Sequence, residues 1–136
     1  MRTLFLASAL AFVTTTAGCS KAKDTAEANV PTVSVAELDA SLSKAAAIPV
    51  DANGERTRKK LGIIPGAVLL TDSDNWAISE LPADKTKPLV FYCANTSCGA
   101  SHEAAEKAMT AGYTNVKVLP DGIAGWVKAG KKAASI

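Results

Sequence analysis

The stretch FYCANTSCGASHEAA, residues 91–105, places two cysteines, Cys93 and Cys98, close to the only histidine of the chain, His102. A cysteine is a nucleophile as its thiolate, and its ordinary pKa of about 8.5 leaves only a few per cent ionised at neutral pH. Backbone N–H groups that point inward from a loop ending at a helix N-terminus favour the thiolate without any side-chain charge. The same N–H groups can hold an oxyanion or a bound sulfur anion. The stretch therefore predicts thiol chemistry.

The residues around the two cysteines suit such a loop, because small or turn-tolerant residues let a backbone wrap closely around one atom. They are Ala94, Asn95, Thr96, Ser97, Gly99, Ala100 and Ser101. We expect them to form an anion-binding loop. His102 falls in the first turn of the next helix, where the helix dipole disfavours a protonated imidazole. It is therefore either a neutral hydrogen-bond partner near the thiol or an exposed residue without a chemical role.

Strands and helices must alternate to position this loop. KPLVFYC, residues 87–93, is apolar on both faces, which is typical of a central parallel strand. The other strands are expected at 32–35, 48–51, 67–70 and 114–119, and helices at 35–46, 55–60, 101–111 and 123–128. Such alternation predicts an α/β fold, a three-layer α/β/α domain with a mostly parallel five-stranded sheet. Ligands gather at the carboxyl ends of such strands, which is where Cys93 stands.

Single residues at the ends of these elements complete the prediction. Ser34 and Glu37 form a capping box, Ser101 caps the helix after the loop, and Asp74 caps a short helix. Asp51, at the end of a buried strand, is expected to order the fold. Several other side chains are predicted to be structural. Trp76 and Trp126 are expected in the core, and the charges at 55–60 and Lys128, Lys131 and Lys132 are expected in solvent.

The length and the charge of the chain limit which classes of function are expected. The 136 residues fit one domain, and the 15 basic and 13 acidic residues form no basic stripe with interleaved aromatics. Nucleic-acid binding is therefore not expected.

The N-terminus has the layout of an export signal, with Met1-Arg2 followed by an apolar run at 4–13. That run is too short to span a bilayer comfortably. Thr16-Ala17-Gly18-Cys19 resembles the bacterial lipobox, although Thr16 stands where leucine is usual. We expect a lipoprotein-type signal peptide at 1–18, a flexible tether at 19–30 and the folded domain at 31–136. The protein would then face the periplasm in the bacterial cell envelope, attached to the membrane by a lipid on Cys19. Ordinary cleavage and secretion are the alternative.

Five pieces of the chain, in order, resemble the rhodanese (sulfurtransferase) domain over residues 31–130. They are Asp51 after its strand, GIIPGAVLL, LVFYC, SHEAAEKAMTAGY and NVKVLPDGIAGW. In rhodaneses, the cysteine after the third of these pieces takes a sulfane sulfur from a donor such as thiosulfate, forms a persulfide and passes the sulfur on. The resemblance implies a monomer with a small sulfur donor, thiosulfate or a persulfide, and a thiol acceptor. It implies no cofactor beyond the covalent persulfide and no metal.

The resemblance implies Cys93 as the nucleophile. Cys98 is the rival, because counting back from the helix puts the family's loop at 95–100, two residues short of Cys93. A two-residue insertion in the loop resolves this conflict, since strand ends are held more rigidly than loop middles. The loop also lacks the arginine that many members use, and Ile63 and Asn53 stand where the family often has histidine and arginine. Phosphatases of this fold need that arginine, so phosphatase activity is not expected.

Three hypotheses fit the two thiols, which four residues separate, a span that a bent loop can close as a disulfide. In the preferred one, Cys93 carries a persulfide that Cys98 resolves or protects. In the second, the pair is a redox couple or a structural disulfide in a thiol-disulfide protein or an inactive binding module. In the third and least favoured, the two cysteines and His102 bind zinc or copper without an evident fourth ligand.

Overall fold

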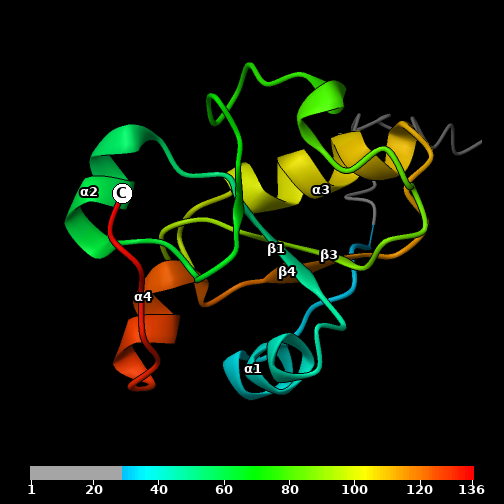
Figure 1. Cartoon of the computed structure of the whole chain (residues 1–136). Coiled ribbons are helices and arrows are strands. Elements are labelled where there is room, and N and C mark those ends of the chain that lie inside the picture. Colours follow the sequence, from blue (N-terminus) through cyan, green and yellow to red (C-terminus); the bar gives the residue numbers. More distant parts are fainter. Residues whose placement is uncertain (1–28) are drawn as a thin grey trace, which may run out of the picture.

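The computed structural model describes residues 29–136 (Figure 1). The expected signal peptide at 1–18, the lipidation site Cys19 and nearly all of the expected tether at 19–30 lie outside the described residues. The elements are α1 (Val35–Ser43), β1 (Ile48–Asp51), α2 (Glu55–Leu61), β2 (Val68–Leu69), the 3₁₀ helix η1 (Ile78–Glu80), β3 (Leu89–Tyr92), α3 (Ala100–Thr110), β4 (Val116–Leu119) and α4 (Gly122–Lys128). Within residues 29–136, no helix combines the length and the apolar character needed to cross a membrane.

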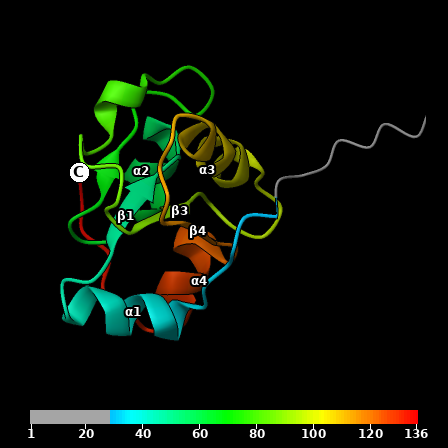
Figure 2. The ribbon, with the colours of Figure 1, turned by 90° about the vertical axis from the view of Figure 1, so that its right-hand side faces the viewer.

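The strands form one parallel sheet in the order β2-β1-β3-β4, with β3 between β1 and β4. Helix α3 covers one face of the sheet, and α1 and α4 lie at the other (Figure 2). The side chains of β3 alternate between these layers. Leu89 and Phe91 pack on the side of α3, while Val90 and Tyr92 pack on the side of α1 and α4. The α/β class, the three layers and the central position of β3 are thus confirmed.

The expected fifth strand at 32–35 does not form, and the sheet of the described residues has four strands. Thr32 makes only a single parallel bridge with Val118. The extended segment stops there because Ser34 caps α1. Its Oγ accepts the N–H of Glu37 at 3.2 Å, and the Glu37 carboxylate accepts the N–H of Ser34 at 2.7 Å. The predicted capping box is confirmed, and it is what ends the strand.

Two other predicted caps are wrong. Helix α3 begins at Ala100 with Gly99 as its N-cap, so Ser101 is a buried residue of the first turn instead. Asp74 caps no helix, because η1 begins only at Ile78 with Ala77 as its N-cap, and Asp74 lies in a turn where its N–H donates to the Oδ1 of Asp72. Both tryptophans are buried as expected, Trp76 against the α3 side and Trp126 against the α4 side.

Candidate functional site at the end of strand β3

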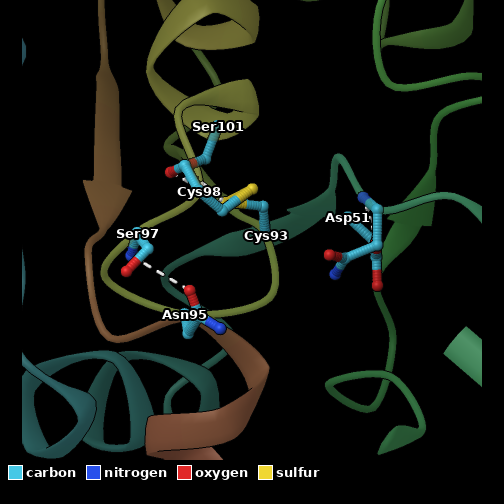
Figure 3. The surroundings of a disulfide bond; sticks show 7 residues. Asp51, Cys93, Asn95, Ser97, Cys98 and Ser101 are labelled. Atoms are coloured by element: carbon cyan, nitrogen blue, oxygen red, sulfur yellow. Dashed lines mark hydrogen bonds between the residues drawn. A yellow bond between two sulfur atoms is a disulfide. The ribbon is translucent and has the colours of Figure 1, made fainter. Parts of the chain in front are cut away.

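Cys93 directly follows β3 and is buried, with 1 % of its surface exposed. Its Sγ is bonded to that of Cys98 in a disulfide whose Cα atoms lie 6.3 Å apart (Figure 3). The disulfide that the spacing allowed is therefore present. The same sulfur lies 3.2 Å from the backbone O of Cys98 and 3.5 Å from the Oγ of Ser101. Cys98 is only half-buried, so it is the outer of the two sulfurs.

We expect the N–H groups of the loop between Cys93 and α3 to point toward the Cys93 sulfur, but within the described chain none of them donates to it. The N–H of Ser97 donates to the Oδ1 of Asn95 at 3.0 Å, and the N–H of Cys98 donates to the Asn95 carbonyl at 3.1 Å (Figure 3). An asparagine side chain competes for nearby amides in this way. Six other N–H groups of the loop and first helical turn have no acceptor within the described part of the chain. They belong to Ala94, Asn95, Thr96, Gly99, Ala100 and Ser101.

Helix α4 holds the start of the loop through two backbone hydrogen bonds. The N–H groups of Ile123 and Ala124 donate to the carbonyls of Cys93 and Ala94, both at 2.9 Å. This approach requires glycine at 122, because its φ is +60° and an added Cβ would lie 2.5 Å from the Cys93 carbonyl oxygen. The close contact fixes the backbone of the nucleophile candidate against α4.

Asp51, at the end of β1, is fully buried beside this loop (Figure 3). Its Oδ1 accepts the N–H of Asn53 at 2.7 Å and the Nε–H of Arg58 at 3.2 Å. Arg58 also donates from Nη2 to the carbonyls of Asp51 and Leu70. The expectation that the charges at 55–60 are solvated is therefore wrong for Arg58, which is buried because it neutralises Asp51. These contacts are those of an acid that orders the fold.

Two buried polar atoms near this ion pair, Oδ2 of Asp51 and Nδ2 of Asn53, have no hydrogen-bond partner within residues 29–136. Tyr92, opposite Asp51 in the sheet, accepts the N–H of Ile64 at 3.0 Å. Burial, and after it the Asp51 carboxylate, raises the pKa of Tyr92 well above its ordinary value. The phenol therefore stays neutral at physiological pH.

A groove of about 820 Å³ lies beside the loop, between the start of α1 and the length of α4. Its lining residues are Ser34, Val35, Ala36, Asn95, Thr96, Asp121, Ala124, Gly125, Lys128, Ala129 and Lys131. Lys131 is paired with Asp39 at 2.5 Å, in contrast to the solvated lysine expected there, whereas Lys128 makes no salt bridge within residues 29–136. This groove is not predicted from the sequence, although the Pro-Asp-Gly turn at 120–122, next to α4, is a signal for a close approach to the loop.

His102 stands apart from the cluster around the disulfide. It is half-buried in the first turn of α3, and within the described chain its imidazole makes no hydrogen bond to either cysteine. No group of three or more His, Cys, Asp or Glu side chains in residues 29–136 is arranged to hold a metal ion. The structure thus brings Cys93, Cys98, Asn95, Ser97 and Ser101 together and leaves His102 outside this set.

The family model for the rhodanese-like domain matches residues 34–129, from the capping box of α1 to the end of α4. The chain belongs to the rhodanese-like domain family. Both loop cysteines fall inside the matched region. Among curated proteins, none matches the sequence significantly.

Several solved structures share the fold of this chain. A protein of unknown function from Rhodopseudomonas palustris, described as a possible tyrosine phosphatase, is 25% identical with a TM-score of 0.64, over 81% of this chain and 89% of that one. A human single-domain sulfurtransferase is 24% identical with a TM-score of 0.57, over 73% and 96%. The thiosulfate sulfurtransferase of Pseudomonas aeruginosa is 24% identical with a TM-score of 0.64, over 79% of this chain but 20% of that one.

Proposed function

We propose that this rhodanese-like domain is a sulfurtransferase or sulfane-sulfur carrier that works through a persulfide on Cys93. The observation that carries the proposal is the place of Cys93, which ends the central strand and begins a loop leading directly into α3. Membership of the family and the sulfurtransferases among the structural relatives support it.

In the proposed reaction, the Cys93 thiolate attacks the sulfane sulfur of a donor such as thiosulfate. A new S–S bond forms, the S–S bond of the donor breaks, and sulfite leaves with its electron pair. An acceptor thiolate then attacks the outer sulfur, takes it as a persulfide and returns Cys93 as a thiolate. No metal or organic cofactor takes part. The Cys93–Cys98 disulfide must be reduced first, because a thiolate is the attacking species.

Hydrogen bonds must hold the sulfur anion, because the loop contains no arginine or lysine. The six N–H groups without an acceptor, at 94, 95, 96, 99, 100 and 101, and the Ser101 hydroxyl are the available donors. The N-terminus of α3 adds its dipole. Backbone donors suit a singly charged persulfide better than doubly charged thiosulfate, so we expect slow turnover with thiosulfate. The groove with Lys128 on its wall lies beside Asn95 and Thr96 of the same loop, and neither cysteine lines it.

The proposed location is the bacterial cell envelope, where a monomer with a lipid on Cys19 would face the periplasm. The support is the signal-like sequence before residue 20. Labelling cells with a lipid precursor tests this step, because label should enter the wild-type protein and not a Cys19→Ala variant. Label in both proteins, or in neither, contradicts the anchor.

Mass spectrometry tests the sulfur chemistry with one loop thiol at a time. Full-length chains carrying Cys19→Ser are reduced, freed of reductant and incubated with thiosulfate or glutathione persulfide. The Cys98→Ser variant, which keeps Cys93, should gain one sulfur atom, and the Cys93→Ser variant should gain none. Equal uptake by the Cys93→Ser variant would transfer the nucleophile role to Cys98. No uptake by either variant would reject the sulfurtransferase proposal.

A thiol-disulfide redox protein, or an inactive binding module, is the second candidate, and the disulfide favours it. In that case neither single-thiol variant takes up sulfur in the same experiment, while the wild-type disulfide exchanges electrons with a dithiol.

A further inference from the structure

We propose that Cys98 is a resolving cysteine that turns the persulfide of Cys93 into hydrosulfide and a Cys93–Cys98 disulfide. The inference rests on the proposed function, because it needs a persulfide on Cys93. It adds a distinct activity to that function. The domain would reduce sulfane sulfur to sulfide instead of only handing it to an acceptor.

The loop holds the two thiols within reach of each other. The Cα separation of 6.3 Å falls in the range of ordinary disulfides. The backbone of Cys93 is held by α4, because its carbonyl accepts the N–H of Ile123. The backbone of Cys98 is held within the loop, because its N–H donates to the carbonyl of Asn95. Well-oriented intramolecular groups reach effective concentrations of about 10⁵ M and above, far beyond any thiol in solution. Resolution by Cys98 therefore outpaces transfer to a small external thiol.

Cys98 attacks the inner sulfur of the persulfide, which is the Sγ of Cys93. In the structure the Sγ of Cys98 is bonded to the Sγ of Cys93, and Cys93 keeps only 1 % of its surface exposed. Attack on that atom forms the disulfide and breaks the S–S bond of the persulfide. The outer sulfur leaves as HS⁻ with the electron pair, and the proton of the Cys98 thiol balances it. The two cysteines are oxidised by two electrons in total, and the sulfane sulfur is reduced by two.

The disulfide then needs an external dithiol to start the next cycle, and burial decides where the dithiol attacks. Cys98 is half-buried while Cys93 is covered, so the incoming thiolate meets Cys98 and the Cys93 thiolate leaves. The second thiol of the reductant then frees Cys98. One full cycle converts thiosulfate and a dithiol into sulfite, sulfide and the oxidised dithiol, and the nucleophile Cys93 is the first thiol to be regenerated.

The test follows sulfide and protein mass after a single loading. Full-length chains carrying Cys19→Ser are reduced, freed of reductant and given one equivalent of glutathione persulfide or thiosulfate without added thiol. The wild-type loop should release about one sulfide per chain and end with a mass two hydrogens below the reduced form. The Cys98→Ser variant should keep the added sulfur and release at least tenfold less sulfide.

A matched control keeps two thiols in the domain but places the second one far from Cys93. Thr110→Cys in the Cys98→Ser background puts a thiol at the far end of α3, about 15 Å along the helix from its first residue. This double variant should behave like Cys98→Ser. Sulfide release from it at the wild-type rate would overturn the resolving role, since any second thiol would then suffice.

The failure of this inference differs from the failure of the proposed function. If wild type retains its sulfur as stably as Cys98→Ser, or if peptide mapping finds the persulfide moved onto Cys98, the resolving step is wrong while the sulfur carrier remains. If no variant takes up sulfur from either donor, both proposals are wrong. The order of reduction has its own readout. Glutathione added to the oxidised protein should be trapped on Cys98, and an adduct on Cys93 would contradict the burial argument.

Discussion

Ser101 is the side chain through which the start of α3 acts on the sulfur of Cys93. Its Oγ lies 3.5 Å from that sulfur and is buried in the first helical turn. Once Cys93 is reduced and ionised, the Ser101 hydroxyl can donate to it, and such a bond is worth about 1 kcal/mol net in favour of the thiolate. In a reduced Cys98→Ser background, Ser101→Ala should therefore slow alkylation of Cys93 at neutral pH about fivefold. Exposed Ser79→Ala should leave the rate unchanged, and equal rates in both variants would remove Ser101 from the site.

Arg58 neutralises the buried acid at the end of β1. Removing one partner of a buried ion pair leaves an uncompensated charge, which costs about 3–5 kcal/mol. We expect this loss in the free energy of unfolding of Arg58→Ala, measured by urea titration. Lys59→Ala is the matched control, because its pair with Glu55 is exposed to solvent and contributes little to stability. A similar, small loss in both variants would show that Asp51 does not depend on Arg58.

Gly122, the first residue of α4, determines how closely this helix approaches the backbone of the loop. Gly122→Ala forces a residue with a Cβ into a positive φ, at a cost of about 1–3 kcal/mol, and pushes that Cβ into the carbonyl of Cys93. Gly130 also has a positive φ, +77°, but nothing lies within 4 Å of an added Cβ. Gly130→Ala should thus lose stability alone, whereas Gly122→Ala should also lose sulfur uptake by Cys93. Full uptake in the Gly122→Ala protein would contradict the supporting role of α4.

Local signals predicted most of the elements. The doubly apolar LVFY run gave the central strand, and Ser34 with Glu37 gave the start of α1. The same local reasoning failed where two signals competed. The segment at 32–35 has strand character, but the cap at Ser34 ends it after a single bridge. Ser101 has the residue type of a cap, yet the helix starts earlier and places it against the sulfur.

Within the site, only the contacts between residues that are close together in the sequence could be predicted. The Cys93–Cys98 pair is visible because its members are five positions apart. The ion pair of Asp51 with Arg58 and the groove along α4 join residues from different elements, and no pattern in one segment announces such partners. The bonds of Ser97 and Cys98 to Asn95 also escape sequence reasoning, because a turn-tolerant residue can direct amides toward itself or toward a ligand.

At the scale of the molecule, the loop cysteines lie beside the two hydrophobic clusters and belong to neither, although Cys93 is itself buried. The clusters lie on either face of the sheet. We therefore expect the loop to change its covalent state while the layers remain. The proposed reaction cycle through thiol, persulfide and disulfide would require this separation.

Reduction of the disulfide tests that separation directly. The bond closes a loop with a sequence separation of 5, for which chain entropy gives only about 2 kcal/mol of stabilisation. Domains of this kind have about 5–15 kcal/mol in all, so the reduced protein should remain folded. Urea titration followed by circular dichroism should show a small shift of the wild-type midpoint on reduction and none for Cys98→Ser. If the wild type unfolds on reduction, the thiolate of Cys93 never exists in a folded site, and the disulfide is a structural staple instead of a step in sulfur transfer.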